Sequence, residues 1–361
     1  MRFKTRAFLL AATALAVAVA VVPVRTAARA SFTHIVVFGT SLSDSGNAFA
    51  LRGATSTPPD YQLDPLLVPG APFARGGLHF SNGATWVEQL ARSLGLAGSV
   101  RPAFASESGD ATNYAVGGAR AYNDGKNVNL GDQVQAFLAD TGGVAPPDAL
   151  YVIEMGSSDI RDAIVAFQSG GFPAAQVVLQ QGLASISQNI QLLYGAGARR
   201  FLVWLPPNVA LTPALRTLEH ASPGAMALAT ALTQAFNGGL SGVLTQLSVL
   251  PEITIQRFNA YVLLNAIVAD PQTYDLTNVT DACVNPNIAP FACDVPTNTC
   301  SGTAFTRPVQ CTRSWRRPPL CCCSPDTAPH GYCRTGIGPD VIAENPSCGM
   351  GSSTGHGTCC D

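Results

Sequence analysis

The sequence predicts an α/β protein in which helices cover both faces of a central parallel sheet. Three observations lead to this fold class: short apolar runs rich in β-branched residues, longer segments with helical periodicity, and the alternation of the two along the chain. Strands buried on both faces are nearly continuous apolar runs, and the crossover between parallel neighbours is normally a helix. In such sheets the functional groups gather at the carboxyl ends of the strands.

Four segments are predicted as strands. Residues 33–38 (THIVVF) are apolar, end at Gly39 and have the pattern of a buried strand. The same pattern recurs at 149–156 and 199–207, and in a weaker form at 252–258.

Three helices are predicted between these strands. In the first, Trp86, Leu90 and Leu94 fall on one face, after a capping box formed by Thr85 and Glu88. The other two are long, at 173–197 and 223–247.

The first thirty residues have the composition of an export signal. A basic start is followed by an apolar run at 7–22, and residues 28–30 (ARA) match an A-x-A cleavage site. The alternative is a transmembrane anchor, but the run is shorter than the roughly 20 residues that span a bilayer. We therefore expect cleavage after Ala30, a periplasmic or extracellular protein, and no integral membrane segment in the mature chain.

Loss of this segment would make the protein more acidic. It holds five basic residues and no acidic ones, so its removal takes the net charge from −2 to −7. A negative charge of this size argues against nucleic acid as a partner. Residues 31–296 are expected to form one domain and the chain a monomer, with no internal repeat and no linker before residue 290.

The segment FGTSLSDSGN at 38–47 directly follows the first predicted strand. Ser41 lies two residues past Gly39, where a strand would turn into a helix. Its hydroxyl can project from the sheet edge there, while nearby amide N–H groups face an anion. The alternative is a turn rich in Ser and Gly that only caps a helix.

Several ordered motifs resemble those of the GDSL, or SGNH, hydrolases, in particular their secreted lipase, phospholipase and hemolysin-like branch. Residues 38–47 are close to the family form FGDSLSDTGN. The other motifs are FSNGATWVEQLA (80–91), NYAVGGARAY (113–122), VIEMGSSDIRDA (152–163) and TNVTDACVNP (277–286). The resemblance covers roughly residues 33–296. It implies a three-layer α/β/α sandwich and ester hydrolysis by a serine nucleophile, with no cofactor and no metal.

The resemblance also implies roles for individual residues. Ser41 would be the nucleophile, and its backbone N–H one oxyanion donor. Gly118 would give a second backbone N–H, although the pair Gly117-Gly118 also fits a plain tight turn. Ser158 stands where the family has the asparagine of G-x-N-D, and it offers one short hydroxyl in place of two amide N–H groups. Thr40 replaces the family's aspartate, so we expect the loop to lose a charge that fixes it.

The base and its orienting carboxylate are missing from the sequence. The family supplies them near the C-terminus as D-x-x-H, usually within a string like YLFWDGIHPT. No D-x-x-H occurs here. His34, His79 and His220 are interpreted as structural or solvated, and Asp326 and His330 are one residue too far apart.

The bases behind residues 297–315 permit the missing string in a neighbouring reading frame. When each codon takes the third base of one residue and the first two of the next, residues 298–308 allow Y-L-F-W-D-G-I-H-P-T. The Asp would be encoded across Gly302-Thr303 and the His across Phe305-Thr306. We infer a frame slip near Pro296 or Thr297.

Residues 297–361 would then be an out-of-frame tail, poorly ordered. This origin explains why nine of the eleven cysteines lie between Cys300 and Cys360, while none precedes Cys283. One alternative is a disulfide module, which an oxidising compartment favours. The other is a zinc site, although the tail has no paired C-x₂-C spacing. Cys283 and Cys293 precede the slip and are expected to form a native disulfide.

The sequence thus predicts an exported serine esterase, lipase or phospholipase that acts through an acyl-enzyme and is severely impaired in this chain. One alternative is an acyltransferase with the same nucleophile, and another is a non-catalytic binding protein with a decayed site. An ordinary α/β-hydrolase is disfavoured, because residues 39–43 (GTSLS) lack the second glycine of G-x-S-x-G.

Overall fold

The computed structural model describes residues 32–52, 79–80, 84–105 and 111–282. The expected export signal at 1–30, the tail at 297–361 with its frame slip, the pair Cys283 and Cys293, and Asp326 with His330 lie outside the described residues. Within the described part of the chain, no helix combines the length and the apolar character needed to cross a bilayer.

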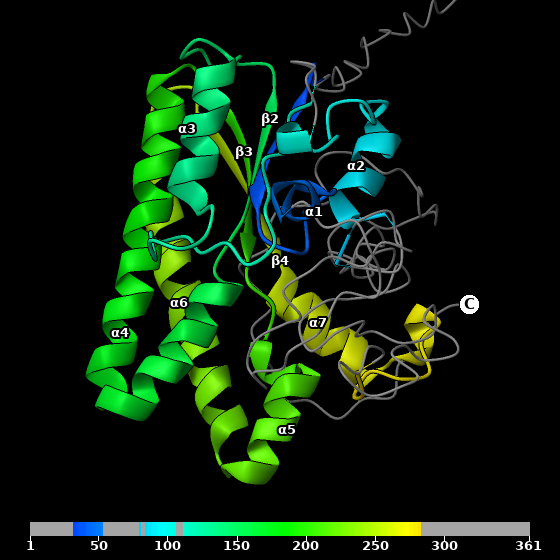
Figure 1. The fold of residues 1–361 in the computed structure, drawn as a ribbon, viewed down its shortest axis with the longest axis vertical. Coiled ribbons are helices and arrows are strands. Elements are labelled where there is room, and N and C mark those ends of the chain that lie inside the picture. The colour runs from blue at the N-terminus through cyan, green and yellow to red at the C-terminus, as the bar shows by residue number, and fades with distance from the viewer. Residues whose placement is uncertain (1–31, 53–78, 81–83, 106–110, 283–361) are drawn as a thin grey trace, which may run out of the picture. The chain divides into compact units, whose positions relative to one another are not determined.

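The four predicted strands form one parallel sheet (Figure 1). They are β1 (Ile35–Gly39), β2 (Leu150–Glu154), β3 (Arg200–Leu205) and β4 (Thr254–Asn259), hydrogen-bonded in that order. The fourth prediction was weaker because β4 lies at the edge of the sheet: its residues are exposed or half-buried, whereas β1 and β2 are buried throughout. An edge strand needs no continuous apolar run.

A short extended segment at 112–116 continues the sheet beyond β1, and the sequence did not predict it. Tyr114 N–H donates to Val37 O at 2.8 Å, and Val116 N–H donates to Gly39 O at 3.1 Å. The bridge between Val37 and Asn113 is parallel. This segment therefore ends at the same edge of the sheet as β1.

The described residues form seven α-helices, which lie on both sides of the sheet (Figure 1). They are α1 (Asn47–Arg52), α2 (Trp86–Leu94), α3 (Leu130–Asp140), α4 (Ser157–Gly195), α5 (Pro213–Ala221), α6 (Ala225–Leu247) and α7 (Ala260–Ala269). The predicted capping box begins α2, with Glu88 accepting from Thr85 N–H at 2.7 Å.

Helix α4 begins sixteen residues before the predicted start at Pro173. The element contains a break at Gly171, which has φ of 62°, and Pro173 begins the second half. Proline is compatible with the first turn of a helix because its missing N–H is not needed there. The predicted segment 173–197 is therefore the second half of a longer, broken helix.

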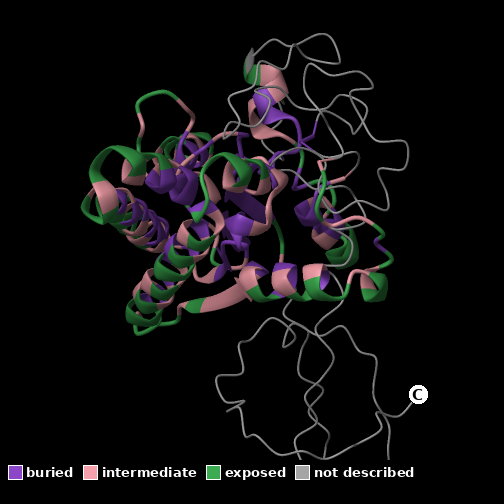
Figure 2. Ribbon diagram, turned by 90° about the horizontal axis from the view of Figure 1, so that it is seen from below, coloured by how far each residue is buried: buried purple, intermediate pink, exposed green. Residues whose placement is uncertain are grey.

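Alternate residues of the strands face two separate apolar clusters. Val36 and Phe38 pack with residues of α3, α4 and α6, whereas Ile35 and Val37 pack with residues of α2 and α7. The buried residues line the inner sides of the helices in Figure 2. Because helices cover both faces, the predicted three-layer α/β/α sandwich is confirmed.

Candidate active site

The three predicted site segments follow the carboxyl ends of three adjacent extended segments. Ser41 follows β1, Gly118 follows the segment 112–116, and Ser158 follows β2. Because all three run parallel, these residues lie at one edge of the sheet. Ser41, Gly118 and Ser158 are all half-buried. Each is therefore in part open to a ligand.

Ser41 lies in a tight turn. The carbonyl of Thr40 accepts hydrogen bonds from the N–H groups of Ser43 and Asp44, both at 3.1 Å. Leu42, Ser43 and Asp44 are buried. The turn therefore presents Ser41 at the sheet edge, while the residues after it are packed inside.

Asp44 joins this turn to the glycine pair. Its carboxylate accepts from the backbone N–H groups of Gly46 and Asn47 at 2.7 Å, Gly117 at 2.8 Å and Ala48 at 3.0 Å. Burial raises the pKa of the Asp44 carboxyl above its ordinary value, although the four N–H groups oppose the shift. One carboxylate thus fixes the spacing between the Ser41 turn and the Gly117-Gly118 loop.

Two buried asparagines add a second connection between the same segments. Asn47 Nδ2 donates to the carbonyls of Asn113 at 2.7 Å and Ala115 at 2.9 Å. In return, Asn113 Nδ2 donates to the carbonyl of Ser43 at 2.8 Å and to Ser45 Oγ at 2.9 Å. Asp44, Asn47 and Asn113 were not predicted as site residues, although an Asp three residues before an Asn in a serine- and glycine-rich turn is a signal of side-chain bonding to the backbone.

The expectation that Thr40 leaves the turn without a fixing charge is corrected by the structure. A carboxylate reaches this position from β2: Glu154 accepts from Thr40 N–H and from Thr40 Oγ1, each at 3.0 Å. Glu154 also accepts from Ser43 Oγ at 3.1 Å. In the sequence, Glu154 is only a charged residue at the end of an otherwise apolar strand. A charge in a strand that is expected to be buried is itself a signal that the residue has a polar role.

The two glycines of the pair have different roles. A Cβ on Gly117 would lie 2.1 Å from the Phe80 ring, so only glycine fits there. Gly118 has φ of 88°, in the left-handed region that glycine favours. A guanidinium N–H of Arg120 donates to the Gly118 carbonyl, which fixes the orientation of this peptide.

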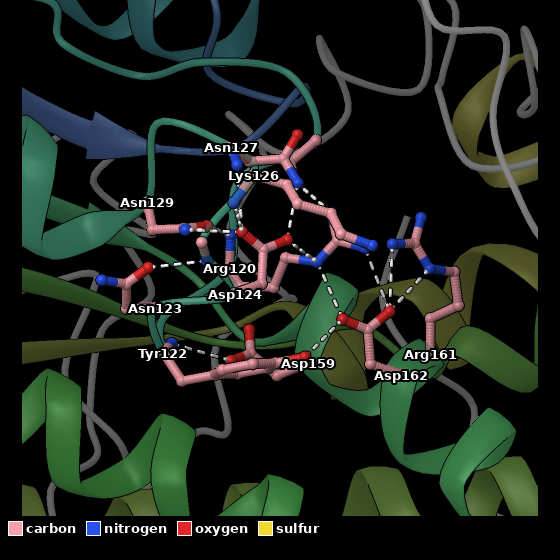
Figure 3. A network of polar contacts seen from close by, with 12 residues as sticks. Arg120, Tyr122, Asn123, Asp124, Lys126, Asn127, Asn129, Asp159, Arg161 and Asp162 are labelled. Carbon is pink, nitrogen blue, oxygen red and sulfur yellow. Dashed lines mark hydrogen bonds and ion pairs between the residues drawn. The ribbon is translucent and has the colours of Figure 1, made fainter.

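Arg120, which bonds to the Gly118 carbonyl, also belongs to a network of acidic and basic side chains, shown in Figure 3. Arg120 Nε bonds to Asp162 at 2.8 Å and lies 3.4 Å from Asp124. Tyr122 Oη donates to Asp162 at 2.8 Å. Because Asp162 belongs to α4, the network ties the loop after Gly118 to the helix that carries Ser158.

Asp159 makes a second tie from the same helix. Its buried carboxylate accepts from the N–H groups of Ala121 at 3.0 Å and Tyr122 at 3.3 Å. Burial raises the pKa of Asp159 to about 6, against the lowering effect of these backbone contacts. Gly182 leaves the space for this side chain, since a Cβ there would lie 2.8 Å from Asp159 Oδ1.

The turn before Ser158 depends on glycine. Gly156 has φ of 114°, and a Cβ there would lie 2.5 Å from Pro206 and Phe236. Gly156 is the N-cap of α4, so Ser158 lies in the first turn of the helix. Backbone N–H groups in a first helical turn favour negative charge, which suits a site that receives an oxyanion.

The three histidines within the described residues lie where a structural or solvated role was expected. His79 Nε2 lies 2.9 Å from Glu88 Oε2, and both side chains are largely buried. Burial by itself would raise the pKa of Glu88, but the contacts with His79 and Thr85 together outweigh it and the pKa is lowered. His34 and His220 are exposed.

Comparison with known proteins assigns the chain to a family. The GDSL-like lipase/acylhydrolase model matches residues 35–291, most of the chain. The chain therefore belongs to this family and is a carboxylic ester hydrolase of the esterase/lipase type.

Individual relatives agree with this assignment. A GDSL esterase/lipase of Arabidopsis thaliana is 25% identical, covering 70% of this chain and 74% of that protein. Lipase 1 of Photorhabdus luminescens is 27% identical over 54% of this chain but only 25% of its own length. The thermolabile hemolysin of Vibrio parahaemolyticus is 22% identical, covering 70% of this chain and 51% of that protein.

Proposed function

We propose that the protein is an exported serine esterase or lipase that hydrolyses acyl esters of lipids through an acyl-enzyme. The observation that carries this proposal is the tie between the two loops. Asp44 holds Gly117, next to Gly118, against the turn that presents Ser41. A nucleophile and a backbone oxyanion donor must be held at a fixed separation, and this contact supplies that constraint.

The proposed chemistry begins with attack of Ser41 Oγ on the ester carbonyl carbon. The carbonyl oxygen becomes an oxyanion that accepts from the N–H groups of Ser41 and Gly118 and from the Ser158 hydroxyl. Collapse expels the alcohol, which takes up the proton lost by Ser41, and leaves an acyl-serine. Water then attacks the acyl group, releases the carboxylic acid and returns the proton to Ser41.

The proton needs a base, and we propose that this base was lost to a frame slip near Pro296 or Thr297. In the displaced frame the Asp is encoded across Gly302-Thr303 and the His across Phe305-Thr306. Loss of one member of a serine triad costs several orders of magnitude, while binding and the oxyanion donors leave a residual rate. The chain with this sequence is therefore a slow enzyme.

Covalent labelling tests the nucleophile in the chain as it stands. The protein is incubated for hours with a p-nitrophenyl alkylphosphonate, and the adduct is located by mass spectrometry. We expect slow phosphonylation at Ser41 and none at that peptide in Ser41→Ala. Ser93→Ala, at an exposed position of α2, serves as the control and should retain labelling. Modification at another serine, or none at all after long exposure, would contradict the proposed nucleophile.

The nucleotide sequence tests the lost base. Across the codons of residues 298–308, the account requires bases that spell Tyr-Leu-Phe-Trp-Asp-Gly-Ile-His-Pro-Thr in the neighbouring frame. Any other reading at the Asp or His junction rules out the frame slip. The protein would then be better described as a binding protein that kept the fold without a working triad.

A further inference from the structure

Glu154 is a buried carboxylate that the proposed chemistry does not use. It is the last residue of β2, is 1% exposed and pairs with Gly39 across the sheet. A buried carboxylate is costly unless hydrogen bonds satisfy it. The hydrogen bonds of Glu154 therefore show which part of the structure its buried charge holds in place.

Among these contacts are hydrogen bonds to Thr40 and Ser43, which lie on either side of Ser41 in the turn. Glu154 accepts from the N–H and the hydroxyl of Thr40, each at 3.0 Å, and from the hydroxyl of Ser43 at 3.1 Å. Trp86 Nε1 donates to Ser43 Oγ at 3.0 Å, so the Ser43 hydroxyl accepts from α2 while it donates to Glu154. The turn is thus held on both sides of Ser41 by one carboxylate.

The end of β1 is shaped to admit this carboxylate. A Cβ on Gly39 would lie 3.2 Å from Glu154 Oε2 and 3.0 Å from the Cβ of Ser43. On the other side, Gln133 accepts from Gly39 N–H at 2.8 Å and donates to the Gly39 carbonyl at 2.9 Å. The peptide before the turn is therefore fixed, and the Glu154 carboxylate occupies the space that glycine leaves.

We propose that Glu154 is the positioning residue of Ser41, and that Thr40 and Glu154 form a reciprocal pair. The turn contributes the hydroxyl and β2 contributes the carboxylate, so the charge that fixes the turn enters from the neighbouring strand. This inference rests on Ser41 being the nucleophile. It gives Glu154 a role in reactivity without contact with substrate.

A reciprocal exchange tests the pair. Thr40→Asp alone brings a second carboxylate against Glu154, and the two like charges repel. Glu154→Gln alone removes the negative charge and leaves one acceptor oxygen in place of two, so the charge-assisted bonds to Thr40 and Ser43 are lost. In the double variant the carboxylate lies on the turn and the amide of residue 154 donates to it, which restores a charge-assisted bond.

The expected rates follow from this geometry. Each single variant should phosphonylate Ser41 at least about 10-fold more slowly, since a misplacement of about 1 Å can cost about 10²-fold. The double variant should recover to within about threefold of the parent, because residues in direct contact are strongly non-additive. Circular dichroism at the assay temperature shows that each variant is folded.

Hydrogen exchange gives a readout that does not depend on reactivity. Amides of residues 39–46 should exchange faster in each single variant and regain protection in the double variant. Glu219→Gln is the matched control, because Glu219 also accepts backbone N–H groups, from Gly224 at 2.9 Å and Met226 at 2.7 Å. It should speed exchange only at the turn between α5 and α6.

The outcomes separate this inference from the proposed function. If the double variant is no better than the worse single variant in both measurements, Glu154 is not the partner of Thr40 and the inference is overturned. If exchange shows recovery but the parent is never phosphonylated at Ser41, the nucleophile assignment fails while the anchoring of the turn by Glu154 stands.

Discussion

At the scale of single residues, the site depends on carboxylates that hold backbone amides. Asp44 accepts four backbone N–H groups, and Glu154 holds Thr40 and Ser43. Neither carboxylate is placed to touch the reacting atoms in the proposed chemistry. Their common effect is to hold the turn that carries Ser41, the proposed nucleophile, without covering the serine.

Replacing Asp44 by asparagine should lower the free energy of unfolding. An amide in this place presents hydrogens to N–H groups, so at least two buried donors lose their partner, at a cost of about 2–4 kcal/mol. Denaturant titration measures the change. Asp132→Asn is the control: Asp132 accepts from Asn129 N–H at 2.9 Å but is exposed, so about 1 kcal/mol or less is expected. Equal losses in both variants would argue against a special role for Asp44.

Replacing Ser158 by asparagine should speed the reaction of Ser41. The asparagine side chain reaches further and offers two N–H donors, and one oxyanion donor is typically worth about 10²–10³ in rate. We expect the phosphonylation rate to rise about 10-fold or more. Ser169→Asn, at an exposed position of the same helix, should leave the rate unchanged. A rate that does not rise, or that falls, would remove Ser158 from the oxyanion site.

At the scale of elements, the loop after Gly118 is tied to α4 by Asp159 and Asp162. The sequence showed the two segments as separate motifs, and the contacts join them. Asp159 couples this tie to pH. Its pKa is about 6 in the folded chain, against an ordinary value of about 3.9.

The pH dependence of stability tests this coupling. Between about pH 4 and pH 6 the folded state holds a proton on Asp159 that the unfolded state has lost, so this group makes stability fall as pH rises through that window. In Asp159→Asn this contribution is absent, and the stability of the variant relative to the parent should rise by up to about 3 kcal/mol from pH 4 to pH 7. Urea titration at both pH values measures the difference. The same relative stability at both would show that Asp159 does not titrate in this window.

The close approach of Gly117 to Phe80 offers a test of how the loop of Gly117 and Gly118 is packed. Gly117→Ala places a methyl group 2.1 Å from the ring and should cost about 1–3 kcal/mol. Adding Phe80→Leu removes the ring and should recover part of that loss. Gly131→Ala is the control, since nothing lies within 4 Å of the added Cβ, and a small gain is expected within α3. Thermal unfolding of the parent, the two single variants Gly117→Ala and Gly131→Ala, and the double variant measures these differences. A Gly117→Ala variant as stable as the parent would contradict the close contact between Gly117 and Phe80.

At the scale of the whole molecule, the fold could be predicted because its strands and helices carry strong periodic signals. β1, β2 and β3 are nearly continuous apolar runs, and the capping box at Thr85 marks the start of α2. The segment 112–116 could not be predicted, because it is short and polar at Thr112 and Asn113. Ser41, Gly118 and Ser158 could be named as candidates from ordered motifs, and their roles stay predictions. Glu154 and Asp44 were missed because their role lies in contacts between segments far apart in the chain.

We propose Ser41 as the nucleophile of an ester hydrolase whose base lies in a displaced frame. The most direct measurement is the rate at which the protein hydrolyses p-nitrophenyl butyrate. The rate is compared between the chain with this sequence and a chain whose reading frame is restored after Pro296, and each is also tested with Ser41→Ala. Restoration should raise the rate by about 10³-fold or more, and Ser41→Ala should abolish the gain. Equal rates before and after restoration, or a gain that survives Ser41→Ala, would contradict the account.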